Sequence, residues 1–214
     1  MSLVTVVVGQ VGDDFAPIAH YCKGTVYIIS YMKLEEINLT ALKRDDLNIK
    51  YVYINFFNAL SSFKTIKDLK NDILQKYGGI DVLINNCTYN FQANTTFPID
   101  IQASALVNFN CFTVMKVCEV LFRLLKIGSS TVIYCALKYD YFCAIPDNNK
   151  KKTIQDNKLT SYQLKKWLNQ YLEATAQKNH EVAWGNSPYA VSKAGFVALK
   201  NIHKRKLVSK GKFK

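Results

Sequence analysis

The chain has 214 residues, of which 49% are hydrophobic and 21% are charged, a balance typical of a single soluble globular domain. Its 28 Lys and Arg residues outnumber its 16 Asp and Glu residues, and the net charge of +12 is concentrated at 148–152 and 203–214. Because no zinc-finger spacing or RNP-like aromatic motif accompanies this charge, we interpret it as solvated helix surface and tail, not as a nucleic-acid or membrane-surface site. No uninterrupted apolar run reaches the ~18 residues of a membrane helix.

The six cysteines show no Cys-x-x-Cys pair and no regular spacing, and the chain has only three histidines. This pattern predicts free, buried thiols in a reducing compartment and no metal site. The apolar start, MSLVTVVVG, lacks a basic leader and a small-residue cleavage site, so a buried strand is a better interpretation than a signal peptide. We therefore expect a cytoplasmic protein.

Five short stretches rich in Val, Ile and Tyr are predicted to form strands buried on both faces. They lie at 3–9, 24–31, 50–55, 80–86 and 130–136. Apolar residues at helical spacing predict a helix over 61–77, with Ser61 or Ser62 as its N-cap, and a second helix covers 110–126. Strands that alternate with helices indicate βαβ units, and hence a Rossmann-like α/β fold with a doubly wound parallel sheet in a three-layer α/β/α arrangement. Ligands of such sheets bind beyond the carboxyl ends of the strands.

The second half of the chain contains one polar stretch and one further helix. The stretch 137–158, with PDNNKKK, is predicted to be a loop, and 159–177 is predicted to be an extra helix opened by Thr160 as its cap. No linker divides the chain, so we expect one domain over 1–214, ending in a basic tail at 203–214.

Four motifs follow one another at the predicted strand ends and in the helices after them. They are NNCT at 85–88, Asn110 within NFNCF, YCA at the end of the fifth strand, and Tyr189-x-x-x-Lys193. Their order and spacing resemble the short-chain dehydrogenase/reductase family, and in particular its monomeric carbonyl reductases. The segment LTSYQLKKWLNQYLEAT before the tyrosine is similar to an insertion that distinguishes those reductases from most of the family.

The resemblance implies an NADPH-dependent reductase of small carbonyl compounds (ketones, aldehydes or quinones). Tyr189 would donate a proton to the carbonyl oxygen, and Lys193 would favour its phenolate electrostatically and hold the nicotinamide ribose. Asn110 would anchor a water of the proton relay, while Gly9 and Asn86 would line the cofactor site. The extra helix would cover the surface through which other members associate, which implies a monomer.

Three departures from the family pattern leave catalysis open. Ala136 stands where the family has a serine that donates to the substrate oxygen, and loss of such a donor costs ~10²–10³ in rate. In the phosphate loop Gly9 is kept, but Asp13 and Phe15 replace glycines, so we expect weak NADPH binding with Phe15 as a steric obstacle. The chain also ends before the family's last strand or strands. The alternative is therefore a non-catalytic relative that acts as a binding or scaffold protein.

Overall fold

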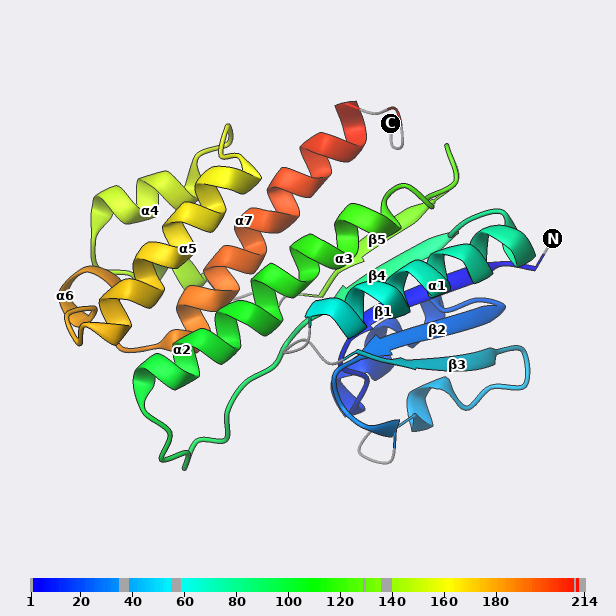
Figure 1. The fold of residues 1–214 in the computed structure, drawn as a ribbon, viewed down its shortest axis with the longest axis horizontal. Helices are drawn as coiled ribbons and strands as arrows, with labels where there is room; N and C mark the ends of the chain where they lie inside the picture. The colour runs from blue at the N-terminus through cyan, green and yellow to red at the C-terminus, as the bar shows by residue number, and fades with distance from the viewer. Residues whose placement is uncertain are drawn as a thin grey trace. The chain divides into compact units, whose positions relative to one another are not determined.

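Five parallel strands form one sheet in the order β3-β2-β1-β4-β5 (Figure 1). The strands are β1 (Val4–Gly9), β2 (Thr25–Ser30), β3 (Asn48–Tyr53), β4 (Val82–Asn86) and β5 (Thr131–Tyr134). The structure is a computed structural model that describes residues 2–34, 39–54, 59–128, 130–135, 140–209 and 211, with the backbone alone at 13–14, 41 and 59–63. Each strand lies within about two residues of its predicted bounds. The predicted doubly wound parallel sheet is confirmed, and its order reverses between β1 and β4.

Residue contacts divide the chain into two compact units. The sheet unit comprises Met1–Thr88, Lys116–Cys135 and Leu207–Lys214, and the helical unit comprises Tyr89–Met115 and Ala136–Lys206.

In the sheet unit, β1, β2 and β4 are buried along their whole length, whereas the edge strands β3 and β5 are partly exposed. The strands are linked by η1 (Asp13–Tyr21), η3 (Thr40–Leu42), α1 (Ala59–Tyr77) and the end of α3 (Thr113–Leu121). The connection η1 is a 3₁₀ helix with Pro17 inside it, and proline lacks the backbone N–H that an α-helix would use at that position. The helix α1 begins at Ala59, so the predicted N-cap at Ser61 or Ser62 is wrong.

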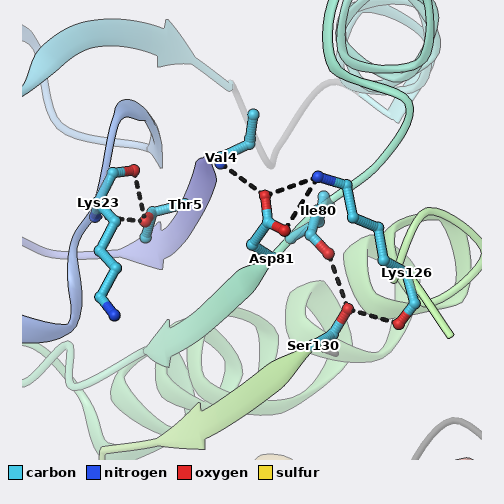
Figure 2. Close-up of polar contacts among 7 residues, drawn as sticks. All are labelled: Val4, Thr5, Lys23, Ile80, Asp81, Lys126 and Ser130. Atoms are coloured by element: carbon cyan, nitrogen blue, oxygen red, sulfur yellow. Dashed lines mark hydrogen bonds and ion pairs between the residues drawn. The ribbon is translucent and has the colours of Figure 1, made fainter. Parts of the chain in front are cut away.

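A polar cluster joins the amino ends of three strands (Figure 2). The carboxylate of Asp81 accepts a hydrogen bond of 2.8 Å from the backbone N–H of Val4, and the Lys126 ammonium lies 2.8 and 2.9 Å from its two oxygens. The Ser130 hydroxyl lies 2.8 Å from the carbonyl oxygens of Ile80 and Lys126. These bonds fix the amino ends of the strands. Ligands of parallel sheets bind at the other end, beyond the carboxyl ends of the strands.

The helical unit consists of helices and one π-helical segment. They are α2 (Ile99–Val107), η4 (Asn108–Phe112), the start of α3, η5 (Tyr141–Ala144), α4 (Asn148–Gln155), α5 (Ser161–Ala176), α6 (Glu181–Trp184) and α7 (Pro188–Ser209) as far as Lys206. The extra helix is confirmed as α5, and Thr160 caps it in a reciprocal capping box with Gln163. The predicted loop at 137–158 is wrong in part, because η5 and α4 lie within it.

One helical run combines the length and apolar character of a membrane span. Among the described residues, the helical run Ile99–Leu121, of 23 residues, is long and apolar enough to cross a membrane. Charged residues interrupt this run at Asp100, Lys116 and Glu119. The sequence alone therefore did not suggest a membrane helix. In the structure 61% of its apolar stretch is buried, as is common for the core helix of a globular protein.

Candidate functional site

The carboxyl ends of β1 and β4 are joined by a tight backbone contact. Gly9 pairs with Asn86 in the sheet and has φ +111°, and a Cβ added to it would lie 2.4 Å from the Asn86 carbonyl oxygen. The Gln10 N–H donates to that same oxygen over 3.1 Å, and Asn86 Nδ2 donates back to the Gln10 carbonyl over 2.6 Å. Only glycine fits at position 9, and Asn86 braces the loop that follows it.

The loop after Gly9 leads into η1 at Asp13. The side chains of Asp13 and Asp14 lie outside what the structure describes. Phe15 has no exposed surface and packs in the sheet-unit core. Its cluster contains Val7, Val11, Ala19, Cys22, Val26, Ile28, Leu42, Val82 and Ile84. The expected steric obstacle at a phosphate site is therefore wrong, because the Phe15 ring fills the core below the loop.

Tyr189 and Lys193 stand one turn apart at the start of α7, in the helical unit. The Lys193 side chain is fully buried, and its Nζ lies 4.4 Å from the centre of the Phe196 ring. Tyr189 is half-buried, and its ring meets that of Tyr141 edge to face with centroids 6.1 Å apart. The pair thus combines a partly accessible phenol with an ammonium shielded from solvent.

Asn110 lies in the π-helical segment η4 and is fully buried. Its Nδ2 donates two hydrogen bonds of 3.0 Å, one to the Tyr89 carbonyl and one to the Ser192 hydroxyl. The Ser192 hydroxyl donates in turn to the Tyr189 carbonyl over 2.8 Å. Asn110 Oδ1 has no hydrogen-bond partner among the described residues. The structure therefore connects Asn110 to the Tyr189 turn through Ser192.

Sequence reasoning missed Ser192, the residue that makes this connection. A serine between Tyr189 and Lys193 gives no sequence signal beyond that of a polar residue in a helix. Its role depends on burial, since it has no exposed surface, and on the wide turn of η4 that brings Asn110 to it. Segments of π-helix occur often at functional sites.

Comparisons with known proteins place the chain in a family. No protein-family model matches it. Carbonyl reductase 3 (NADPH) of Homo sapiens is 29% identical over 158 residues, which are 72% of this chain and 56% of the relative. Carbonyl reductase 1 (NADPH) of Mus musculus is 34% identical over 150 residues, covering 67% of this chain and 52% of the relative. The structure of menthone neomenthol reductase from Mentha piperita matches with a TM-score of 0.75 at 18% identity, covering 100% of this chain and 88% of that one.

The chain belongs to the short-chain dehydrogenase/reductase family. It spans about half the length of the curated relatives it matches. The resemblance found in the sequence is thereby confirmed, at modest identity, for a protein of carbonyl reductase type.

One departure from the family pattern, the missing serine, lies just after β5. Cys135 follows β5, and its N–H donates to the Asn85 carbonyl over 2.9 Å. The next residue, Ala136, lies outside the described residues, so the replacement of the family's serine remains a sequence observation.

No disulfide joins the six cysteines, all of which the structure describes; four are buried as predicted, but Cys135 is partly exposed and Cys143 is exposed. Burial raises the pKa of the Cys22 thiol to about 12, against a smaller opposing effect of Arg44. Burial also raises the pKa of Cys118, so these thiols stay protonated and unreactive at neutral pH. In the part of the chain that the structure describes, no three His, Cys, Asp or Glu side chains are grouped to hold a metal ion.

Proposed function

We propose that the chain is an NADPH-dependent reductase of ketones, aldehydes or quinones in which Tyr189 is the proton donor. The observation that carries this proposal is the first turn of α7. There a half-buried tyrosine stands one turn from a fully buried lysine, and Asn110 is tied to the same turn. The relatives named as NADPH carbonyl reductases support the same chemistry.

The residues of this chain would divide the work as follows. NADPH, when bound, supplies the hydride that reduces the carbonyl carbon. Tyr189 hydrogen-bonds the carbonyl oxygen through its hydroxyl and gives it a proton as negative charge develops there. The buried ammonium of Lys193 stabilises the phenolate that remains, since a charge acts more strongly away from water.

Each unit by itself can be compared with what NADPH needs. In the helical unit, the Lys193 ammonium and the Oδ1 of Asn110, which has no hydrogen-bond partner among the described residues, are polar groups suited to the hydroxyls and water around a nicotinamide ribose. In the sheet unit, Gly9 and Asn86 form a loop at the strand ends where a pyrophosphate would lie. In the sequence, Asp13 and Asp14 follow this loop and bring two negative charges, so we propose that NADPH binds weakly.

The test is NADPH oxidation by the purified protein with a quinone or an aromatic aldehyde. Tyr189→Phe keeps the ring and removes the hydroxyl, and we expect the rate to fall by about 10²–10⁴. Tyr162→Phe is the matched control, because Tyr162 is 78% exposed on α5, and it should leave the rate unchanged. An undiminished rate in Tyr189→Phe would overturn the proposed role of the tyrosine. NADPH binding without turnover in the unmodified chain would favour the alternative, a non-catalytic binding or scaffold protein.

A further inference from the structure

A cleft opens in the sheet unit between α1 and the end of α3. Its volume is about 370 Å³, and it is lined by Lys67, Lys70, Glu119, Val120 and Arg123. The two helices lie side by side over one face of the sheet (Figure 1). This space, the α1–α3 cleft, shares no residue with the candidate site described above. Its volume lies at the lower end of the range of small-molecule sites, about 300–1,000 Å³.

The helix α1 supplies two cations to one wall of the cleft. Lys67 and Lys70 are three positions apart on α1 and therefore lie on one side of the helix. The adjoining stripe of Ile66, Leu69 and Ile73 is buried in the core. This packing fixes the rotation of α1, so that both lysines line the cleft.

The turn after α3 supplies a third cation to the other wall, and it is anchored to the sheet. The Arg123 N–H donates to the Val120 carbonyl over 3.2 Å, and the Leu124 carbonyl accepts from the Ile80 N–H over 2.8 Å. Leu124 and Leu125 are buried, whereas Arg123 is exposed. The guanidinium is therefore carried by a fixed backbone, as a binding site requires.

The three cations of the cleft are not neutralised by other described residues. The ion pairs in the described part of the chain use the cations Arg44, Lys50, Lys76 and Lys126 instead. One carboxylate, Glu119, lines the cleft, and it makes no ion pair with a described residue. Three positive groups against one negative group leave the cleft with a net positive charge, which attracts anions.

The rest of the cleft offers apolar surface. Val120 lines it from α3 and is partly exposed. Lysine and arginine side chains also have aliphatic stems, which cover apolar surface while the charged ends reach water. An inorganic anion would contact the charged ends alone. An anion with an apolar body would contact both kinds of surface.

We propose that the α1–α3 cleft binds an amphipathic organic anion, with its acidic head at Arg123 and the two lysines and its apolar body against Val120. A guanidinium suits such a head because it donates two parallel hydrogen bonds to a phosphate or carboxylate. Glu119 and the negative carboxyl end of α3 oppose the anion. The proposal goes beyond the proposed reductase activity and does not depend on it.

The experiment is calorimetric titration of the unmodified chain with octyl phosphate below its micelle concentration. We expect saturable binding, which Arg123→Gln weakens about tenfold and Lys67→Gln or Lys70→Gln about threefold. Glu119→Gln removes the opposing charge and should strengthen binding about twofold or more. Absence of saturable binding, or no gain in Glu119→Gln, would overturn the proposal.

Matched controls separate the cleft from general attraction by the charge of +12. Lys64→Gln on α1 and Lys43→Gln after η3 remove exposed charges that do not line the cleft, and each should change binding less than about twofold. Unchanged melting temperatures show that the variants are folded. Equal losses in the cleft and control variants would overturn the proposal. Displacement of octyl phosphate by excess NADPH would also overturn it, because the probe would then occupy the cofactor site.

Three further probes test the class of ligand. Inorganic phosphate lacks the apolar body and should bind about tenfold more weakly, while the uncharged octyl glucoside should not bind saturably. Vesicles of phosphatidylcholine and phosphatidylserine present acidic heads only at a membrane surface, and we expect no sedimentation of the protein with them. Equal affinity for inorganic phosphate would overturn the amphipathic class. Vesicle binding that Arg123→Gln abolishes would overturn the assignment to a free ligand.

Discussion

The Lys193 side chain has no exposed surface. Transfer of an ammonium group from water to the protein interior costs several kcal/mol unless neighbouring groups compensate. The Phe196 ring, 4.4 Å from Nζ, offers a negative face worth about 2 kcal/mol when desolvated. Such a residue is costly to keep for stability alone, which fits a role in chemistry.

Lys193→Met should therefore separate activity from stability. Methionine has a similar length and no charge, and it removes the cost of burying an ammonium, so we expect the free energy of unfolding to change much less than the activity. Turnover should fall by about 10² or more, because the phenolate loses its counter-charge. Urea unfolding and NADPH oxidation measure the two effects. A large loss of stability with proportionate loss of activity would show that the lysine is structural.

His203 should make stability depend on pH. Burial, with a smaller contribution from Lys206, lowers its pKa from 6.5 to about 3. Between those values the unfolded chain takes up a proton that the folded protein excludes, so His203 stabilises the fold above pH 6.5 and this contribution is lost as the pH falls toward 3. Over the first 1.5 pH units the loss is about 2 kcal/mol.

The measurement is the urea midpoint of unfolding between pH 7 and pH 5. His203→Gln should flatten the fall seen in the unmodified protein, whatever its own effect at pH 7. His20→Gln, at an exposed position, should leave the slope as it is. An equal dependence on pH for all three proteins would mean that the folded protein binds a proton at His203 as readily as the unfolded chain does.

At the scale of elements, the strands and α5 were predictable because local sequence determines them. Runs of Val, Ile and Tyr suit strands buried on both faces, and Thr160 with Gln163 forms a capping box that sequence spacing alone can suggest. The tyrosine and lysine of the site share a helical turn by spacing alone. Asn110 was found only through the family resemblance.

Other elements depend on contacts that local sequence does not show. The helix α4 has a single buried residue, Ile154, so PDNNKKK resembles a loop. Its stability comes from the Asp147 cap and from the contacts of Lys150, whose carbonyl accepts from Trp167 Nε1 and whose ammonium lies 4.2 Å from the Trp184 ring centre. Phe15 was misplaced because the family pattern indicates its position in the loop and not the direction of its ring.

The packing of α7 against η4 requires a glycine. A Cβ added to Gly195 would lie 2.9 Å from Cys111 Sγ and 3.0 Å from the Leu168 side chain. Although alanine is normally the better helix former, we expect Gly195→Ala to destabilise the protein by about 1–3 kcal/mol through overpacking. Chemical unfolding of Gly195→Ala, Cys111→Ala and the double variant tests this. The double variant should lose less than the sum of the single losses, and strict additivity would contradict the clash.

At the scale of the whole molecule, we propose that the protein is a monomer. The helix α5 buries Leu164, Trp167, Leu168 and Tyr171 within its own unit, and the net charge of +12 opposes self-association. The partly exposed edge strand β5 acts in the other direction, because an open edge favours pairing with another chain. Light scattering at micromolar concentration should give the mass of one chain, and a stable dimer or tetramer would contradict the proposal.

The most direct test of the account is titration of NADPH fluorescence with the purified, unmodified chain. We predict saturable binding that is weaker by about tenfold or more than that of the mouse carbonyl reductase 1 titrated in parallel, because Asp13 and Asp14 repel the pyrophosphate. Asp13→Asn should strengthen NADPH binding. Asp45→Asn, at an exposed position before the amino end of β3, should not. Absence of saturable binding would contradict the account of this chain as an NADPH-dependent reductase, and binding as tight as the relative's would contradict the effect assigned to the two aspartates.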